Sequence, residues 1–524
     1  MYHVLVSDPI SEEGLLPLIN HDSVTCDQMP IEAAEQSLEL YDALLIRSGT
    51  KVTDNLLKKM PNLKIIARAG VGVDNIDIEA ATRRGVIVIN APDGNTISTA
   101  EHTIAMIASL VRNIPQATRS VKDGIWDRSR FTGMELNGKT LGIIGMGRIG
   151  TEISKRAKAF GIKVNVYDPY LTKERGEKLG VASVSFNDLL ESSDIITVHT
   201  PLTKETKGLL GFDSIPRTKK GVWLINCARG GIIDEEALYH FIKTGHVAGA
   251  ALDVFETEPP KKNKLLELDE VITTPHIGAS TKEAQLNVAA QVADEVLDCL
   301  QGIPIKNSIN LPTISAEIYD KVKPFFHLTK KMGTILSQMV RTPVKEIELT
   351  YSGEVISLET AVLTRNLMAG FLSARVDSPV NEVNAPSIAS QRGIIHGEKT
   401  GLKADGYSNL IQATVHGEEE TFYIRGTNIQ EYGERIVNLN GFDIDFYPGG
   451  NLLYIQHTDR PGVIGNVGKI LGEHHINIAT MQVGRKEIGG DAIMILSFDE
   501  PLDEEVILAL KEIQDLVSVK KLEL

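Results

Sequence analysis

The chain contains an apolar, strand-like run that leads directly into a glycine-rich turn. Residues 139–150 read Lys-Thr-Leu-Gly-Ile-Ile-Gly-Met-Gly-Arg-Ile-Gly, so Gly145, Gly147 and Gly150 form a complete G-x-G-x-x-G pattern. Between a strand and a helix, such glycines allow a tight turn and close approach of the backbone to a pyrophosphate, which the helix N-terminus attracts. The segment therefore predicts a βαβ unit in a doubly wound, parallel sheet that binds a dinucleotide.

A carboxylate follows at the spacing expected for ribose recognition. We expect a helix over 151–160, which Gly161 ends, and then a second strand over 163–167. Asp168 stands at the tip of that strand, where a carboxylate accepts hydrogen bonds from ribose hydroxyls and repels a 2′-phosphate. The pattern predicts NAD rather than NADP as the cofactor.

Length and composition narrow the class of protein. With 524 residues the chain is too long for one hydrophobic core, and we expect about three or four domains. The net charge of −15 argues against nucleic acid as a partner, and no segment has the pattern of a membrane span or a signal peptide. Cys26, Cys227 and Cys299 are too few for a disulfide framework and lack metal-ligand spacing. We therefore expect a cytoplasmic protein without a metal site.

The chain before the glycine motif alternates short apolar strands with helical segments. We expect strands over 43–46, 64–67 and 86–89, which together indicate a small α/β unit. A long helix over 96–112 carries little charge after Glu101. This helix is expected to be buried between two lobes and to act as a hinge.

Polar residues follow each apolar strand predicted after the motif. These strands are expected over 194–198, 222–225, 247–252 and 271–274, and near-continuous apolar runs suit a parallel sheet covered on both faces. The residues that follow them are His199, Thr200, Asn226, Cys227, Ala228, Arg229, Asp253 and His276. Because ligands of such sheets bind beyond the carboxyl ends of the strands, we expect these residues to converge on the nicotinamide.

The second half of the chain reads as two further units. After a helix over 282–300 and a turn over 302–304, we expect a mixed α/β unit with a helix over 316–340 and strands that include 345–350 and 420–424. The last unit has the ferredoxin-like order strand, helix, strand, strand, helix, strand. Its elements are predicted over 452–457, 462–473, 476–483, 492–498, 504–513 and 517–522.

Three side chains are suited to hydride-transfer chemistry on a hydroxy acid. The guanidinium of Arg229 matches a carboxylate with two parallel hydrogen bonds, although a surface ion pair is the alternative. His276 is placed to take a hydroxyl proton, although a structural histidine is the alternative. Glu258 or Glu256 could orient that imidazole, and spacing alone does not separate the two.

These motifs resemble those of the D-2-hydroxyacid dehydrogenase family, in the family's order and at similar separations. The similarity lies in residues 145–150, 226–231, 253–260 and 275–280. It implies that Arg229 is the catalytic arginine, that Glu258 rather than Glu256 is the catalytic glutamate, and that His276 is the acid/base. It also implies cofactor contacts from Gly145, Gly147, Arg148, Ile149, Gly150, Asp168, Thr200, Cys227, Ala228, Arg229, Asp253, His276, Gly278 and Ala279.

Within this family, the whole chain is similar to the long-form branch whose members oxidise D-3-phosphoglycerate to 3-phosphohydroxypyruvate, the entry to serine synthesis. The similarity includes the loops 47–51, 69–75 and 93–96 and an arm over 124–131. It implies substrate contacts from Arg47, Ser48, Gly72, Asn95 and Arg128. Arg47 would contact the substrate phosphate, and Arg128 would reach the site of a partner subunit in a homodimer or homotetramer.

The last unit resembles an ACT domain through residues 457–462 and 476–478. This resemblance implies an L-serine effector bound by His457, Asp459 and Asn477, although ACT domains also serve as plain dimerisation modules. The middle unit, including residues 381–386, is similar to the extra domain of the long-form enzymes, and its ligand is not indicated.

The resemblance implies an α/β architecture of two Rossmann-like lobes, an intervening α/β domain and a ferredoxin-like ACT domain. We assign 1–95 with 284–312 to the substrate domain, 96–283 to the NAD domain, 313–450 to the intervening domain and 451–524 to the ACT domain. Two other functions stay open at this point. One is a related reductase of glyoxylate, hydroxypyruvate or D-lactate, and the other is a non-catalytic, NAD-sensing interaction protein.

Overall fold

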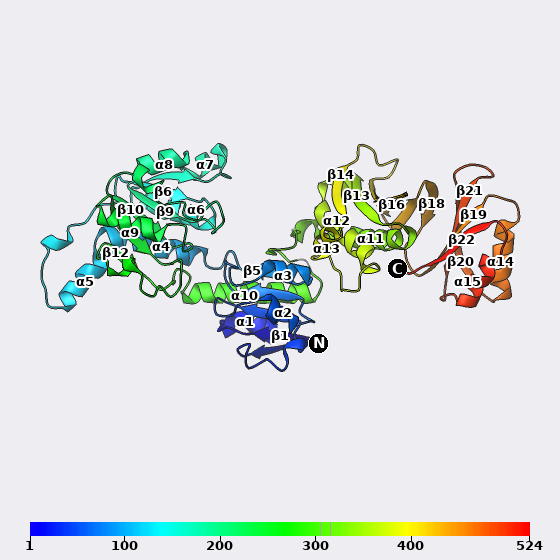
Figure 1. Ribbon diagram of the computed structural model, residues 1–524, viewed down its shortest axis with the longest axis horizontal. Helices are drawn as coiled ribbons and strands as arrows, with labels where there is room; N and C mark the ends of the chain where they lie inside the picture. Colours follow the sequence, from blue (N-terminus) through cyan, green and yellow to red (C-terminus); the bar gives the residue numbers. More distant parts are fainter. Residues whose placement is uncertain (304, 315) are drawn as a thin grey trace.

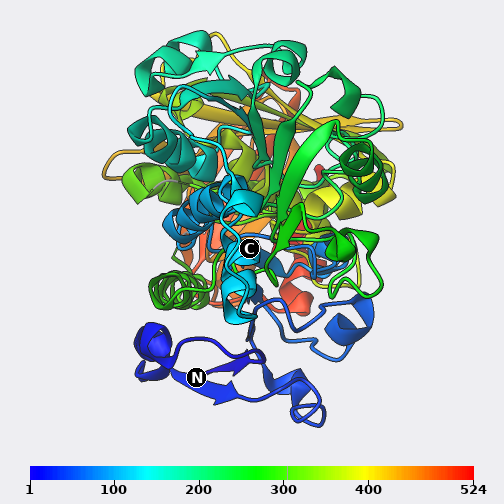
Figure 2. The same cartoon turned by 90° about the vertical axis from the view of Figure 1, so that its left-hand side faces the viewer.

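The computed structural model describes residues 1–303, 305–314 and 316–524, and over these residues the chain forms four β-sheets (Figure 1). The predicted turn over 302–304 includes Pro304, which lies outside the described residues. The units that contain the sheets follow one another along the longest axis, with the glycine-motif unit at one end and the last unit at the other (Figure 1). Viewed from the glycine-motif end, that unit lies in front of the intervening and last units (Figure 2).

The first lobe is a parallel sheet of strand order β2-β1-β3-β4-β5. Its strands are β1 (Tyr2–Val6), β2 (Val24–Gln28), β3 (Ala43–Ile46), β4 (Ile65–Arg68) and β5 (Ile87–Asn90). Helices α1 (Glu12–Ile19) and α10 (Lys282–Leu300) cover one face, while α2 (Asp54–Lys58) and α3 (Ile78–Arg83) lie on the other. Because both faces are covered, the inner strands are almost wholly apolar.

The second lobe is a parallel sheet of strand order β12-β11-β10-β9-β6-β7-β8. Its strands are β6 (Thr140–Ile144), β7 (Lys163–Tyr167), β8 (Ala182–Ser183), β9 (Ile195–Val198), β10 (Val222–Asn226), β11 (Val247–Leu252) and β12 (Val271–Thr273). The helices of this lobe and its connections are α4 (Thr96–Val111), α5 (Ile114–Lys122), α6 (Arg148–Ala159), α7 (Lys173–Leu179), α8 (Phe186–Ser192) and α9 (Glu235–Lys243).

Helix α6 begins three residues earlier than the sequence predicts. Its N-cap is Gly147, so the helix starts at Arg148 and Gly150 already lies in the first turn. The prediction was wrong here because it placed the whole glycine motif in the turn. The early start brings the free amides of the first turn next to the middle glycine, where a phosphate would approach.

Two chain crossings join the lobes. Helix α4 leaves the first lobe and packs against α6 and strands β10 to β12 of the second, and α10 returns to the first lobe. The two helices begin side by side, with the hydroxyls of Ser98 and Thr281 2.7 Å apart. Thr99 and Ala284, in the first turns of these two helices, line the space between the lobes.

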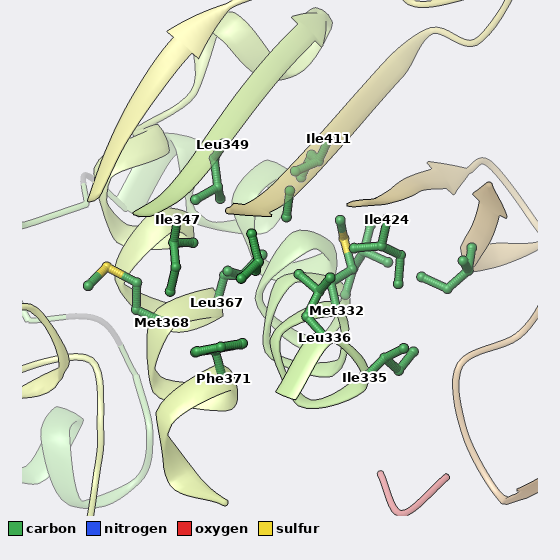
Figure 3. Packing of buried hydrophobic residues seen from close by; sticks show 14 of the residues in the cluster. Met332, Ile335, Leu336, Ile347, Leu349, Leu367, Met368, Phe371, Ile411 and Ile424 are labelled. Atoms are coloured by element: carbon green, nitrogen blue, oxygen red, sulfur yellow. The ribbon is translucent and has the colours of Figure 1, made fainter. Parts of the chain in front are cut away.

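The intervening unit has a mixed sheet of strand order β14-β13-β15-β16-β17-β18. Its elements are β13 (Val344–Gly353), β14 (Ile395–Thr400), β15 (Asn409–Gly417), β16 (Thr421–Ile429), β17 (Gly433–Leu439), β18 (Phe442–Phe446) and the helices α11 (Ala316–Met339), α12 (Thr360–Ser373) and α13 (Ala385–Gln391). Side chains such as Leu336, Leu367, Phe371, Ile347 and Ile411 fill the space between α11, α12 and the sheet (Figure 3).

The last unit has the predicted ferredoxin-like order and an antiparallel sheet of strand order β20-β21-β19-β22. Its elements are β19 (Asn451–Thr458), α14 (Val463–Glu473), β20 (Ile478–Arg485), β21 (Asp491–Phe498), α15 (Glu504–Lys511) and β22 (Leu516–Leu522). The helices cover one face of the sheet, and Leu452, Tyr454, Ile493 and Ile495 on the other face join the core of the intervening unit.

The predicted fold class, two Rossmann-like lobes followed by a mixed α/β unit and a ferredoxin-like unit, is therefore confirmed. Across the ranges that the structure describes, no helix combines the length and the apolar character needed to cross a membrane.

Candidate active site

A cleft of about 810 Å³ lies between the two lobes, at the carboxyl ends of their strands. Of the catalytic, cofactor and substrate residues that the family resemblance implies, those that line it are Arg47, Ser48, Gly72, Asn95, Ile149, Thr200, Cys227, Ala228, Arg229, Asp253, Glu258, His276, Gly278 and Ala279. Those outside its lining are Gly145, Gly147, Arg148, Gly150, Asp168 and Arg128. The structure thus brings most of the predicted catalytic, cofactor and substrate residues into one space.

The three motif glycines occupy positions with different physical demands. Gly145 has a φ of +98°, and a Cβ there would lie 2.5 Å from the carbonyl oxygen of His199. A Cβ at Gly150 would collide with the carbonyl oxygen of Gly145. At Gly147 a Cβ would meet no atom within 4 Å, so the backbone is open on that side. The turn is therefore closed at both ends and open in the middle, as a bound pyrophosphate requires.

Asp168 lies directly beside this turn. Its carboxylate accepts a hydrogen bond from the amide of Met146 at 2.7 Å and another from the amide of Tyr170 at 2.8 Å. Arg148, the other predicted cofactor residue at the turn, pairs with Asp93 at 2.6 Å. The hydrogen bonds from Met146 and Tyr170 fix the Asp168 carboxylate at the edge of the glycine turn, where the adenosine ribose of a dinucleotide would lie.

Several buried polar atoms in and beside the cleft have no hydrogen-bond partner in the part of the chain that the structure describes. They are Nδ1 of His199, Oγ1 of Thr200, Oδ1 of Asn95, Oγ1 of Thr96 and Nε of Arg68. Burial, which disfavours the charged imidazolium, lowers the pKa of His199 to about 3, so this imidazole is neutral at physiological pH. Buried polar atoms are normally paired, so these atoms indicate that ligands complete the site. Together with the glycine turn, they fit NAD.

His276 and Glu258 form a close pair in the lining of the cleft. Nδ1 of His276 lies 2.8 Å from Oε2 of Glu258, and the other carboxylate oxygen accepts a hydrogen bond from the amide of Phe255 at 3.1 Å. The backbone amide of Glu256 instead donates a hydrogen bond to the Glu235 carboxylate, at 2.7 Å. The geometry therefore makes Glu258, and not Glu256, the partner of the histidine.

A buried carboxylate holds the loop that carries His276. Asp253 is 1% exposed, and it accepts hydrogen bonds from the amides of Ile277 at 2.8 Å and Gly278 at 2.9 Å. Thr274 donates to the same carboxylate at 2.6 Å, and His102 of α4 lies 3.3 Å from it. Burial works against ionisation, but these hydrogen bonds outweigh it and keep the pKa of Asp253 below its usual value. His102 was not predicted, because it lies inside a helix and not at a strand end.

Arg229 lies across the cleft from the loop after β4. Its Nε lies 3.1 Å from Oδ2 of Asp74 in the first lobe, and its Nη1 donates to the carbonyl oxygen of Ala228 at 2.7 Å. Asn226 holds the turn in place, since its side chain donates to the Arg229 carbonyl and accepts from the Ala228 amide. A guanidinium is thus presented at the cleft by a rigid turn.

The loop that carries Arg47 is fixed by two side chains of the first lobe. The carboxylate of Asp8 accepts hydrogen bonds from the amides of Arg47 at 2.6 Å and Thr50 at 3.1 Å. Asn75 donates to the carbonyl oxygens of the same two residues, at 2.7 and 2.6 Å. This bracing places Arg47 at the first-lobe end of the cleft.

Arg68 is a second basic residue of this region, and no sequence motif singled it out. It is the last residue of β4 and lines the cleft. Desolvation, together with the nearby charge of Arg229, lowers the pKa of Arg68 to about 10, which still leaves it protonated at neutral pH. The strand-end rule that identified the second-lobe residues could have found it, had the rule been applied to the first sheet as well.

Arg128 and the predicted effector residues lie away from the cleft. Arg128 is exposed on the arm that follows α5. Figure 1 shows α5 and this arm at the outer end of the second lobe. Asp459 accepts hydrogen bonds from Arg485 at 3.1 Å and from the Gly489 amide at 3.2 Å, at one end of β20. Asn477 lies before the other end of β20, with its side chain 3.3 Å from Asp499. The structure therefore does not bring Asp459 and Asn477 together within one chain.

His457, the third predicted effector residue, is 2% exposed, and its Nδ1 lies 2.9 Å from the carbonyl oxygen of Thr458.

Residues 1–303, 305–314 and 316–524 contain no group of three or more His, Cys, Asp or Glu side chains arranged to hold a metal ion.

Comparison with known families divides the chain into three matched regions. Residues 104–278 match the NAD binding domain of D-isomer specific 2-hydroxyacid dehydrogenases. Residues 321–440 match the D-3-phosphoglycerate dehydrogenase intervening domain, and residues 452–515 match the ACT domain.

Individual relatives match over the whole chain or over the two lobes. The D-3-phosphoglycerate dehydrogenase of Bacillus subtilis is 58% identical over 524 residues, which cover 100% of both chains. That of Archaeoglobus fulgidus is 44% identical over 528 residues, which cover 99% of this chain and 100% of the relative. A crystal structure of D-lactate dehydrogenase from Aquifex aeolicus, complexed with NAD and lactic acid, superimposes with a TM-score of 0.52 at 32% identity. That match covers 57% of this chain and 96% of the other.

The structure combines a dinucleotide-binding turn with a cleft that contains Arg229 and the pair of His276 and Glu258. The full-length relatives and the three matched regions point to the same class of enzyme. The chain therefore belongs to the D-3-phosphoglycerate dehydrogenases, NAD-dependent oxidoreductases of the D-isomer specific 2-hydroxyacid dehydrogenase family.

Proposed function

We propose that this chain oxidises D-3-phosphoglycerate to 3-phosphohydroxypyruvate, the first step of the phosphorylated route to L-serine, and that Arg229, Glu258 and His276 carry the reaction. The observation that supports this most directly is the arrangement of the cleft. The pair of His276 and Glu258 and the guanidinium of Arg229 face the same space as Arg47 and Arg68. One cleft therefore offers a proton acceptor, a carboxylate anchor and two further cations suited to a phosphate.

The roles of these residues follow from their contacts. Because Nδ1 of His276 faces Glu258, Nε2 is the nitrogen available to remove the proton of the substrate C2 hydroxyl. Glu258 fixes the orientation of the ring and stabilises the imidazolium that forms. Arg229 anchors the substrate carboxylate and polarises the C2 oxygen. The glycine turn and Asp168 would hold NAD, whose nicotinamide C4 would supply the acceptor for the hydride that leaves C2 as the hydroxyl becomes a carbonyl.

We expect Arg47→Ala to weaken selectively the binding of phosphorylated substrates. A charge-assisted hydrogen bond to phosphate contributes about 1.5 to 3 kcal/mol, so the KM for D-3-phosphoglycerate should rise about 10- to 100-fold. The kcat/KM for D-glycerate, which lacks the phosphate, should change less than about twofold. Steady-state kinetics on both acids measures the difference.

Lys51→Ala is the matched control, because Lys51 is an exposed cation only four residues away and does not line the cleft. It should leave both substrates unaffected. Equal losses on D-3-phosphoglycerate and D-glycerate in Arg47→Ala would contradict the phosphate role of Arg47.

We propose that the chain forms a homodimer or homotetramer through the arm after α5. Val121 at the end of α5, together with Ile125 and Trp126 on the arm, exposes a large apolar side chain, and Trp126 is 78% exposed. Exposed apolar side chains grouped in this way favour burial against a second copy of the chain. Arg128, on the same arm, is then placed to contribute to the cleft of the partner. Sedimentation of the full chain at several concentrations tests this assembly.

We propose further that L-serine binds the ACT domain at a site that two chains share. Asp459 and Asn477 lie at opposite ends of β20, an eight-residue strand about 26 Å long, so one chain cannot place both on one small ligand. Because β20 is an edge strand, its antiparallel pairing with β20 of a second copy would bring Asp459 next to the other Asn477. Nε2 of His457, buried and without a partner in the described chain, is a further candidate contact.

Calorimetric titration of the full chain tests the serine site. Binding of L-serine should be detectable, and Asn477→Ala should weaken it about tenfold or more, since it removes a hydrogen bond to a charged ligand. Asn187→Ala, at an exposed position of α8 in the second lobe, is the control. Unchanged L-serine affinity in Asn477→Ala, or no binding by the original chain, would contradict the proposal.

We also propose a cytoplasmic location and the domain division 1–95 with 284–312, 96–283, 313–450 and 451–524. The location is supported by the three cysteines, which are free thiols. The division is supported by the four sheets and by the packing of α10 on α1 in the first lobe.

A further inference from the structure

We propose that Asp74 occupies, in the substrate-free enzyme, the place on Arg229 that the substrate carboxylate takes, and that it acts as an internal competitor for every 2-hydroxy acid. This inference rests on the proposed role of Arg229 as the carboxylate anchor. Asp74 would lower the apparent affinity of every ligand that binds Arg229, because the ligand must first displace the Asp74 carboxylate.

The contact crosses the cleft. Asp74 belongs to the loop after β4 in the first lobe, and Arg229 follows β10 in the second lobe. Oδ2 of Asp74 lies 3.1 Å from Nε of Arg229, which makes an ion pair between residues 155 positions apart. A carboxylate of the protein is therefore already bound to the arginine at the point where a substrate carboxylate is expected.

The guanidinium has little freedom to bind a second carboxylate while this pair exists. Nη1 donates to the Ala228 carbonyl at 2.7 Å. Nη2 lies against the backbone of Gly72, where a Cβ would collide with it. A carboxylate binds arginine best through two parallel hydrogen bonds, and the edge formed by Nε and Nη2 is the one that Asp74 contacts. Bidentate binding of substrate on this edge requires that Asp74 leave.

Asp74 is suited to be displaced. Its side chain is 69% exposed, so its carboxylate can be solvated by water when it leaves Arg229, whereas the Arg229 side chain is 29% exposed. Pairs with such exposure are weak, because solvent screens the attraction and the side chains lose freedom on pairing. A substrate that also binds Arg47 or Arg68 gains additional affinity from its phosphate. It overcomes the competition more readily than an acid that depends on Arg229 alone.

Every ligand that binds Arg229 must first break the ion pair of Arg229 with Asp74, so each loses the same binding free energy. Asp74→Asn removes the charge but keeps the size of the side chain. It should lower the KM for D-3-phosphoglycerate and for D-glycerate by about two- to fivefold each, with kcat within about twofold. It should also lower the dissociation constant of oxalate, a small dicarboxylate probe, by a similar factor, measured by calorimetry with NADH present. Asp74→Ala should act in the same direction.

Asp54→Asn is the matched control, because Asp54 forms a 2.9 Å ion pair with Arg84 in the same lobe outside the cleft. It should change neither KM nor oxalate affinity. If Asp74 instead orients Arg229, Asp74→Ala will raise KM and weaken oxalate binding, which would overturn the proposal. A KM decrease confined to D-3-phosphoglycerate would indicate a long-range charge effect and would overturn it as well.

The oxalate titration does not depend on turnover. If the original chain fails to oxidise D-3-phosphoglycerate, the proposed function fails, while tighter oxalate binding by Asp74→Asn still supports the competition. If the original chain is active and the variant binds oxalate no more tightly, only the inference about Asp74 fails.

Discussion

Replacing His276 by alanine is expected to lower kcat about 10²- to 10⁴-fold near neutral pH, while the affinity for NADH stays within about threefold. The loss follows from the geometry, because the imidazole is the group that Glu258 orients in the cleft at 2.8 Å. In the described chain the other histidine that pairs with a carboxylate is His102, beside Asp253, and His102 does not line the cleft. Stopped-flow or steady-state NADH formation, with NADH binding followed by fluorescence, measures both quantities.

His240→Ala serves as the control for this variant. His240 lies on α9 and packs against Phe212 and Phe241, outside the cleft lining. It should leave kcat within about twofold. A kcat for His276→Ala within about threefold of the original enzyme would show that the proton acceptor is a different group.

The second large effect is expected for Arg229→Lys. Lysine keeps the charge but loses the planar fork, and it cannot form the same two parallel hydrogen bonds with a carboxylate. Truncating one partner of a hydrogen-bonded charge pair costs about 2 to 5 kcal/mol, so kcat/KM for D-3-phosphoglycerate should fall about 30-fold to several thousand-fold. NADH binding should be affected much less.

A comparable arginine provides the control. Arg435 in the intervening domain also pairs with an exposed carboxylate through Nε, at 2.6 Å from Asp445. Arg435→Lys preserves the charge in the same way and should leave kcat/KM unchanged. If Arg229→Lys retains more than about a third of the original kcat/KM, the fork of Arg229 is not what anchors the substrate.

The candidate site could be predicted from the sequence where one rule applied. Polar residues that directly follow apolar strands include Thr200, Arg229, Asp253 and His276, and all four line one cleft. The rule works because parallel strands end at the same edge of a sheet, whatever the details of the loops. The dinucleotide turn was predictable from its glycine spacing, because Gly145 has a positive φ and Gly150 packs directly on the Gly145 carbonyl.

Residues whose position depends on a long loop or on the other lobe could not be predicted in this way. Spacing did not separate Glu258 from Glu256, and the difference is set by the loop backbone, where the Phe255 amide binds Glu258. Asp74 meets Arg229 only because the two lobes face each other, at a separation of 155 residues that no local pattern records. The resemblance to a known family supplied the choice of Glu258, but neither Asp74 nor Arg68.

In the intervening domain, one strand could be predicted from the sequence and another could not. Strand β14 is an edge strand whose residues are nearly all exposed, so it lacks the apolar alternation that identifies a half-buried strand. It was not predicted. Strand β13, which lies inside the sheet and alternates buried with partly exposed residues, was predicted over 345–350 and runs over Val344–Gly353.

The proposed activity is tested most directly by the formation of NADH by the full chain from D-3-phosphoglycerate, compared with D-glycerate and D-lactate at one alkaline pH. We expect a strong preference for the phosphorylated acid, because Arg47 and Arg68 lie in the same cleft as the pair of His276 and Glu258, which we propose to be catalytic. Activity on none of the three acids, with NADH still bound, would contradict it and would indicate a protein that senses NAD without catalysis.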